Sequence, residues 1–284
     1  MKNPWYIRLA IHAALVVLAL PFLMPLVWMV GTSLKEDAQI FPKEVVTTVP
    51  EFLSQWWPSP FRLANYPEAL RYVPFPIYLR NTLMLCAVNV AAAVASSAVA
   101  AYAFAKLEWR GRSILFGIVI ATIILPGEVR MIPTFALYRW LGWYGTYLPL
   151  IVPAFFGNAF FIFLLRQFFR TIPDDLCDAA RIDGCSEWGI LWRVVLPLSK
   201  PALATCGLFQ LLGTWNDFNG PLLYLNDQTK YTLAYGLQQF LGAYGGEWSK
   251  LMAAATVFTV PIIVLFFLAQ KTFIQGISTT GMKG

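Results

Sequence analysis

Residues 178–201 read DAARIDGCSEWGILWRVVLPLSKP, a charged stretch that contains two glycines and two prolines and lies between two long apolar runs. The chain around it is 58% hydrophobic and only 13% charged, which is too apolar for an ordinary soluble domain. Its 11 Trp, 12 Tyr and 22 Phe are typical of a protein with aromatic belts at membrane interfaces. Because charges are rare and costly inside a bilayer, we expect this stretch to lie outside it.

Six runs of the chain suggest membrane-spanning helices, because a bilayer core of about 30 Å needs roughly 20 apolar helical residues. The predicted spans are about 9–31, 82–105, 113–133, 148–165, 202–225 and 251–270. The first run is too long for a signal-peptide core, so it is interpreted as a retained span. Pro126 interrupts the third, whose continuation is either the end of the span or a short interfacial or re-entrant helix. The predicted fold class is therefore all-α, a polytopic membrane protein with one transmembrane domain over 1–284.

The distribution of Lys and Arg predicts the orientation. With the N-terminus inside, the segments 1–8, 106–112, 166–201 and 271–284 hold 12 Lys and Arg in 65 residues. The segments on the other side hold 9 in 96 residues. Since cytoplasmic loops carry an excess of Lys and Arg, both termini and the loop 166–201 are predicted to be cytoplasmic. The net charge of +6 is interpreted as membrane topology, and no nucleic-acid partner is expected.

Local signals predict two short helices joined by a glycine in this loop. Pro173 can begin the first helix, and Asp174 and Asp175 then occupy the first turn, where the helix dipole favours negative charge. One side of the helix carries Leu176, Ala179 and Ala180. Gly184 can take a positive φ and end it. A second helix follows, with one predicted stripe made of Trp188, Leu191, Trp192 and Val195.

Two interpretations of this loop are open from its physical chemistry. It could be a connector lying on the inner leaflet, which Arg and Trp would suit. Anionic lipid, however, would repel the acids of the first helix. Small alanines flanked by charges are better explained by a helix that docks in a groove of another protein.

The segment resembles the EAA loop of binding-protein-dependent ABC importer permeases. That motif has E-A-A, three residues, a glycine, nine residues and then I-x-L-P. Here 178–180 is Asp-Ala-Ala, Gly184 follows after three residues, and 194–197 is Val-Val-Leu-Pro. The Asp at 178 replaces the usual Glu. Further stretches resemble the carbohydrate-importing, maltose-transporter-type permeases: NYPEAL (65–70), YLRNTL (78–83), AYAFAKLEWRGR (101–112), LRQFFRTIPDDL (165–176), WNDFNGPL (215–222) and KTFIQGISTTGMKG (271–284).

The resemblance implies a permease subunit of an ATP-driven carbohydrate importer in a prokaryotic cell membrane. The loop would then hold the coupling helix that docks on a cytoplasmic ATPase. The implied coupling residues are Asp178, Ala179, Ala180, Arg181, Asp183, Gly184 and Pro197. The implied partners are a second homologous permease, an ATPase dimer and an extracytoplasmic solute-binding protein, besides membrane lipid. The chain has no G-x-x-x-x-G-K-[ST] phosphate loop, so ATP and Mg²⁺ are expected on the ATPase, and this chain is expected to be non-catalytic and to bind no cofactor.

Polar residues within the fifth apolar run are candidates for the substrate pathway, because an acid inside the membrane is usually functional. The candidates are Trp215, Asn216, Asp217 and Asn219. Carboxylates and amides bind sugar hydroxyls, and rings such as Trp215 can stack on sugar faces. The alternatives are a gate, an inter-helix hydrogen-bond network, or a span that ends at Trp215. Asn89, with Ser96 and Ser97, is given a packing role in the second span.

The loop 226–250 is predicted to lie outside and is rich in Gly and Tyr. The resemblance implies that it reaches into the solute-binding protein, with Gly242, Gly245 and Gly246 giving flexibility. An ordinary mobile loop is the alternative.

Three other possibilities are a metal site, a different solute and a different class of transporter. The chain has four cysteines without a C-x-x-C motif and a single histidine, so no metal site is predicted. Within the same class, the alternative is an importer of a glycerol-phosphate-like solute. From a different class, the alternative is an ion-coupled secondary transporter, which would need coupling acids and usually inverted repeats.

Overall fold

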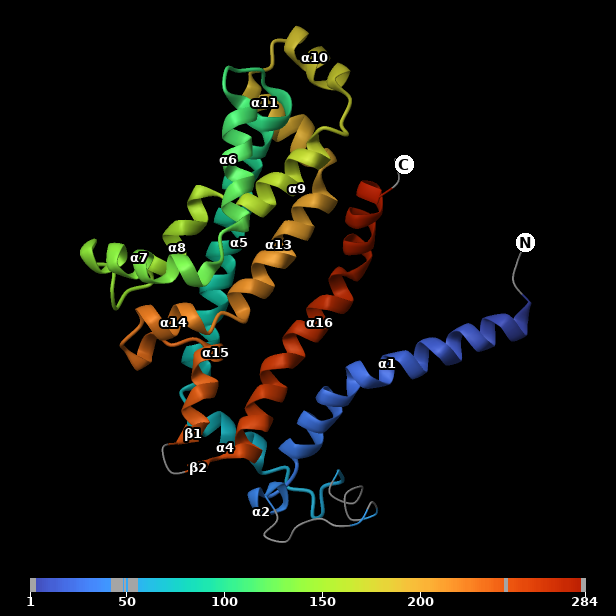
Figure 1. Ribbon diagram of the computed structural model, residues 1–284, viewed down its shortest axis with the longest axis vertical. Helices are drawn as coiled ribbons and strands as arrows, with labels where there is room; N and C mark the ends of the chain where they lie inside the picture. The colour runs from blue at the N-terminus through green and yellow to red at the C-terminus, as the bar shows by residue number, and fades with distance from the viewer. Residues whose placement is uncertain (1–3, 42–47, 49, 51–55, 243–244, 282–284) are drawn as a thin grey trace. The chain divides into compact units, whose positions relative to one another are not determined.

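The protein is mostly helical. The computed structural model describes residues 4–41, 48, 50, 56–242 and 245–281 (Figure 1). The chain divides into two compact units, one formed by 1–75 with 236–261 and the other by 76–235 with 262–284.

The first unit is held together by hydrogen bonds around the end of its long first helix. Its elements are α1 (Trp5–Ser33), α2 (Asp37–Ile40), α4 (Asn65–Tyr72), η4 (Leu237–Phe240), β1 (Leu241–Gly242), β2 (Gly245–Gly246) and the start of α16 (Trp248–Gly281). The buried amide of Asn65 donates to the carbonyls of Ser33 at 2.9 Å and Lys35 at 2.7 Å, which ties α4 to the end of α1. The Ser249 amide donates to the Asp37 carboxylate at 2.8 Å, which ties α16 to α2.

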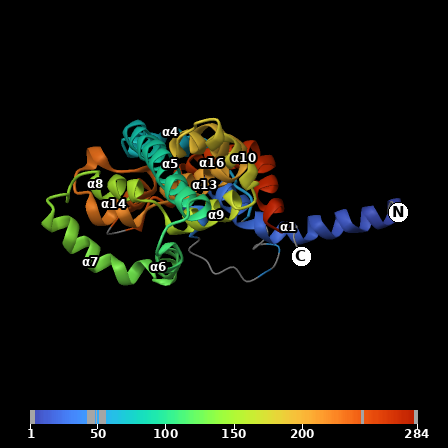
Figure 2. The ribbon, with the colours of Figure 1, turned by 90° about the horizontal axis from the view of Figure 1, so that it is seen from above.

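The second unit is organised around one 32-residue helix, α5 (Phe75–Lys106). The elements that follow are α6 (Arg112–Ile124), α7 (Gly127–Trp140), α8 (Leu148–Ile151), η1 (Val152–Phe156), α9 (Ala159–Phe169), α10 (Asp174–Ile182), α11 (Glu187–Ile190), the π-helix η2 (Leu191–Val195), α12 (Leu196–Leu198), α13 (Lys200–Trp215), α14 (Asn219–Tyr224), η3 (Gln228–Lys230) and α15 (Leu233–Gly236). Figure 2 shows α7 extending away from the group formed by α5, α9 and α13.

The core of this unit lies where α5, α9, α10, η2 and α13 meet. Small side chains of α5 face large ones of α9, including Leu165 and Phe169, both fully buried. Small residues permit the close approach of helices that a membrane bundle needs. Ser96 and Ser97, expected to pack against neighbours, do so, because the Ser96 hydroxyl donates to the Ala154 carbonyl at 2.9 Å and the Ser97 hydroxyl accepts from the Asn158 amide at 2.9 Å.

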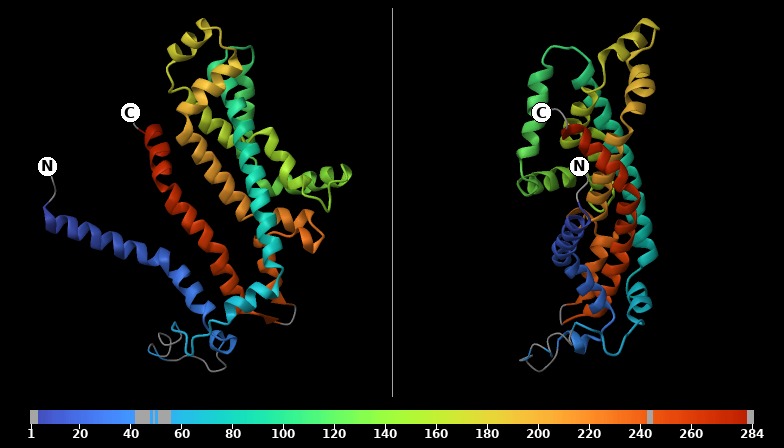
Figure 3. Two further views of the ribbon diagram at one scale, coloured as in Figure 1. Left: turned by 180° about the vertical axis from the view of Figure 1, so that it is seen from behind. Right: turned by 90° about the vertical axis from the view of Figure 1, so that its right-hand side faces the viewer.

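Four helical segments in the described part of the chain are long and apolar enough to cross a membrane: Trp5–Ser33, Phe75–Lys106, Leu148–Phe169 and Trp248–Leu268. Two further pairs reach this length only together, and both are sharply bent. The bend between α6 and α7 is 101°, and the bend between the helices 187–198 and 200–215 is 83°. Figure 3 shows α6 and α7 nearly at right angles.

Two predicted spans therefore differ from single straight helices. The run 113–133 is broken at Leu125 and Pro126, and α6 alone, with 13 residues, extends only about 20 Å. The run 202–225 stops being helical at Trp215 and resumes at Asn219. The sequence alternative in which the helix ends at Trp215 is the one that the structure has.

Candidate functional site

The predicted two-helix loop is present, and its ends follow the local sequence signals. The first helix, α10, begins at Asp174 directly after Pro173 and carries two acids in its first turn. It ends at Ile182, and Gly184 follows with φ +82°, a left-handed conformation that glycine adopts without steric cost. The predicted start and end of this helix are confirmed. Figure 1 shows α10 and α11 near the same end of α5.

A lysine at the end of α5 anchors the start of α10. The Lys106 ammonium, only 2% exposed, lies 2.6 Å from the Asp174 carboxylate and donates to the Ile172 carbonyl, also at 2.6 Å. The hydrogen bond from Lys106 holds the pKa of Asp174 below its ordinary value. The loop is thus attached to the membrane helix by a charge-assisted contact as well as by the chain itself.

A second attachment is a network that joins α10, α11 and α5. The Arg181 guanidinium donates to Asp178 at 2.6 Å and to the nearer oxygen of Glu187 at 2.8 Å. The other oxygen of Glu187 accepts from the Tyr102 hydroxyl at 2.5 Å. The hydrogen bond from Arg181, more than that from Tyr102, holds the pKa of Glu187 below its ordinary value, against the opposing effect of burial. Asp178, one of the implied coupling residues, is therefore already paired within the chain.

The two faces of α10 differ sharply. Cys177 points into the core and is almost fully buried. Leu176, Ala179 and Ala180 were predicted to share one side, and of these Leu176 and Ala179 are exposed, whereas Ala180 is half-buried against the core. Ile182 is 87% exposed. The exposed Asp183 has no ion-pair partner among the described residues. The outer face of α10 thus combines exposed apolar side chains with acids, and among the described residues neither Asp175 nor Asp183 has an ion-pair partner.

The predicted single stripe on the second helix is wrong. Leu191 and Val195 are buried, whereas Trp188 and Trp192 are exposed. The physical reason is that α11 continues as a π-helix over 191–195, where the backbone bonds connect residues five apart and α-helical spacing no longer keeps these side chains on one face. Pro197 is exposed in α12, just before α13 begins.

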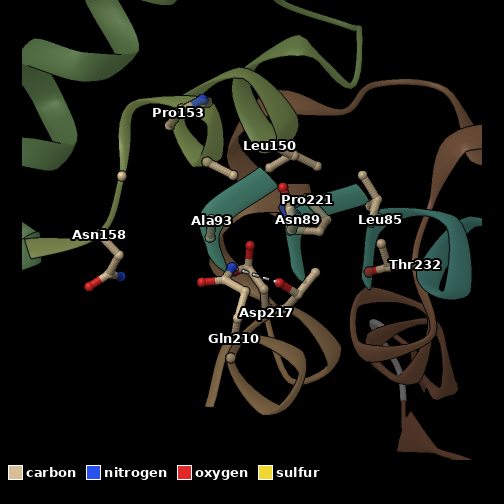
Figure 4. A pocket seen from close by; sticks show the side chains of 14 residues that line it. Leu85, Asn89, Ala93, Leu150, Pro153, Asn158, Gln210, Asp217, Pro221 and Thr232 are labelled. Atoms are coloured by element: carbon tan, nitrogen blue, oxygen red, sulfur yellow. Dashed lines mark hydrogen bonds between the residues drawn. The ribbon is translucent and has the colours of Figure 1, made fainter. Parts of the chain in front are cut away.

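A polar cavity of about 330 Å³ lies within the second unit, at the point where two apolar runs are broken (Figure 4). One break separates η1 from α9 at Gly157 and Asn158, and the other separates α13 from α14. The long helix α5 forms the remaining wall. The polar residues that line the cavity are Asn89, Asn158, Gln210, Thr214, Asp217 and Thr232.

Asp217 is the one predicted pathway residue that lines this cavity. Its carboxylate accepts a hydrogen bond from the Gly220 amide at 2.9 Å, which closes the turn between α13 and α14. Asn216 and Asn219 are exposed and do not line it, and the Asn216 amide instead donates to the Leu212 carbonyl at 2.8 Å. Trp215 is buried and also lies outside the lining. The helix break redirects these neighbours, so the predicted set of four does not converge.

Three amide side chains of the cavity were not predicted. Asn158 caps α9 by accepting from the amides of Phe160 and Phe161. Gln210 donates to the Thr214 hydroxyl at 3.1 Å. Asn89 was predicted to have a packing role, yet it lines the cavity. All three are amides in apolar runs, and that feature could have identified them.

The predicted binding-protein loop 226–250 contains the short elements η3, α15 and η4, followed by the paired strands β1 and β2. Leu241 pairs with Gly246 and Gly242 with Gly245 in an antiparallel ladder. Residues 243 and 244 between the strands lie outside the described residues. Gly242, Gly245 and Gly246 thus have backbone pairing partners, and a Cβ at Gly246 would lie 3.0 Å from the Trp248 indole nitrogen.

Residues 92–279 match the family model described as "Binding-protein-dependent transport system inner membrane component". Over the whole chain, the sequence is 32% identical to the probable ABC transporter permease protein YurM of Bacillus subtilis, of which 91% is covered. It is 36% identical to the arabinooligosaccharides transport system permease protein AraQ of Halalkalibacterium halodurans, over 72% of this chain and 73% of that protein. A chain in the crystal structure of a bacterial ABC transporter that imports the acidic polysaccharide alginate superposes with a TM-score of 0.79 at 25% identity, covering 96% of this chain and 99% of that one.

The chain belongs to the family of binding-protein-dependent transport system inner membrane components. It is a permease subunit of a binding-protein-dependent ABC importer, and members of this family are non-catalytic membrane components.

Proposed function

We propose that this permease subunit imports a carbohydrate, and that it docks on a cytoplasmic ATPase through the loop 166–201. The observation that carries the docking proposal is the outer face of α10. Leu176, Ala179 and Ile182 expose apolar surface on a helix whose other face is anchored by Lys106 and by the Arg181–Glu187 pair. An exposed apolar surface on a rigid support is typical of a protein contact.

The charges favour a protein partner over the inner leaflet. Asp178 is engaged by Arg181, whereas the exposed Asp175 and Asp183 have no ion-pair partner among the described residues. Of these two, Asp183 is proposed to meet a basic group, because it lies next to the exposed Ile182. Gly184 sets the turn that presents this end of α10. In this proposal, closure of an ATPase dimer with bound ATP and Mg²⁺ moves the loop. Alternating access then follows, because the nucleotide state of the partner favours one permease conformation over the other.

The remaining parts of the proposal concern topology and partners. Six spans, of which two are bent pairs, would place both termini and the loop 166–201 in the cytoplasm, in agreement with the Lys and Arg distribution. In this proposal, a second homologous permease completes the translocation pathway, and the paired strands β1 and β2 lie where the extracytoplasmic binding protein docks. The carbohydrate is proposed because relatives such as the arabinooligosaccharide permease carry sugar transport in their names. The polar cavity has no Lys or Arg among its lining residues, which disfavours the alternative of a glycerol-phosphate-like solute.

The test is co-purification of the affinity-tagged chain in a mild detergent, followed by an ATPase assay. We expect an ATPase and a second permease to follow the wild type. Asp183→Arg should release the ATPase, because it reverses the available charge and leaves the Asp178–Arg181 pair in place. Glu108→Arg is the matched control, because Glu108 is also an exposed acid and lies in the separate predicted cytoplasmic segment 106–112. Retention of the ATPase by Asp183→Arg and by Ile182→Glu would overturn the docking surface, and transport without any ATPase would overturn the importer.

A further inference from the structure

The cavity between the helix breaks has a polar group that the protein itself does not satisfy. Asn89 is 5% exposed, and its side-chain oxygen has no hydrogen-bond partner among the described residues. Buried polar groups are nearly always hydrogen-bonded, and one that is not requires an explanation. Its place in the wall of a polar cavity indicates a partner that enters from outside the chain.

We infer that this cavity binds one ring of an uncharged sugar, held by amide side chains in place of aromatic stacking. The inference rests on the proposed function and specifies its solute and residues. Asn89 is contributed by α5, Asn158 by the break before α9, and Gln210 by α13 (Figure 4). In Figure 4, Asn89, Gln210 and Asp217 gather in the middle of the view, with Asn158 and Thr232 on opposite sides.

The chemistry of the lining selects hydroxyl groups. Each amide offers two donors and an acceptor oxygen, and each sugar hydroxyl is itself a donor and an acceptor. The Asp217 carboxylate adds an acceptor. Because the lining residues include one acid and no base, an anionic solute would meet repulsion without compensation. The lining also includes no aromatic side chain, so affinity must come from hydrogen bonds.

The size of the cavity limits what it can hold. A volume of about 330 Å³ is at the lower end of the usual range for small-molecule sites, roughly 300–1,000 Å³. One sugar ring fits this volume better than an extended oligosaccharide. A longer chain would therefore pass the site ring by ring.

The helix that carries Asn89 also carries the attachment of the cytoplasmic loop. Tyr102 and Lys106, which hold α11 and α10, lie on α5 about 20 Å and about 26 Å further along, at about 1.5 Å per residue. A movement of the loop would thus reach Asn89 through one continuous helix.

The test uses the full-length chain in lipid nanodiscs and saturation-transfer NMR titrations. The probes are the methyl glycosides of glucose, galactose, mannose and arabinose, with glycerol 3-phosphate as the charged probe. The variants are Asn89→Leu and Gln210→Met, which remove polar groups at similar volume. Asn216→Leu is the matched control, because Asn216 is an exposed asparagine outside the cavity. Circular dichroism and gel filtration establish that each variant is folded.

We expect saturable binding of at least one methyl glycoside to the wild type and none of glycerol 3-phosphate. Loss of one amide partner should weaken binding about tenfold in each cavity variant and leave Asn216→Leu unchanged. Absence of saturable glycoside binding to the wild type, equal binding of glycerol 3-phosphate, or wild-type affinity in both cavity variants would overturn the inference. The proposed function is tested separately by ATPase co-purification, so the sugar-site inference and the proposed function can fail independently.

Discussion

Tyr102→Phe is the sharpest test of how the cytoplasmic loop is attached to the membrane helix. The substitution removes only the hydroxyl that donates to Glu187 at 2.5 Å, and the ring, 4% exposed, keeps its packing. A hydrogen bond to a charged group contributes roughly 1.5–3 kcal/mol. Glu187 is partly exposed and keeps its contact with Arg181, so we expect a loss at the low end, about 1.5 kcal/mol.

The assay is hydrogen–deuterium exchange of the chain in nanodiscs. A loss of about 1.5 kcal/mol makes local opening about tenfold more frequent, because each 1.4 kcal/mol is a factor of ten. We expect this increase in the amides of α10 and α11 and no change in those of α13. Tyr6→Phe is the matched control, an exposed tyrosine in α1. Unchanged exchange in α10 and α11 would refute the view that the Glu187 network holds the loop.

Two further predictions concern the ends of α10. Gly184→Leu should lower uptake about five- to thirtyfold while membrane insertion persists, because a left-handed leucine costs about 1–2 kcal/mol. Gly184→Asn should retain uptake, since Asn tolerates this conformation. Normal uptake by Gly184→Leu would contradict the reasoning. Asp174→Asn should lower the thermal midpoint at pH 7 but not in acid. The pKa of Asp174 is lowered by Lys106, so its stabilisation is complete above its ordinary pKa and is lost as the pH falls through the lowered value. A wild-type-to-variant difference that persists in strong acid would argue against the ion pair.

In the third apolar run, the sequence predicts that the helix is interrupted but does not predict the angle of the bend. Pro126 and Gly127 indicate that the helix is interrupted, since proline cannot continue the hydrogen bonding of the preceding turn. The angle of 101° between α6 and α7 does not follow from those residues. It depends on what each segment packs against, and α6 packs on α9.

The loop 166–201 likewise has some features that follow from adjacent residues and others that depend on tertiary packing. The start at Pro173 and the turn at Gly184 follow from backbone geometry, which is a property of a few adjacent residues. The exposure of Trp188 and the burial of Leu191 do not follow from adjacent residues, because they depend on the π-helix that begins at Leu191 and on the core that Leu191 and Val195 enter.

The helical class, the membrane setting, the helix ends in the loop 166–201 and the family could all be predicted from the amino-acid sequence. These follow from hydropathy, from backbone preferences of Pro and Gly, and from motif spacing, all of which act over short distances along the chain. Two findings required the folded chain: Asp178 is paired with Arg181, and one cavity is lined by Asn89, Asn158, Gln210 and Asp217. The physical reason is that a cavity wall is built from segments far apart in sequence, at positions where helices break, and no local pattern specifies which side chains meet there.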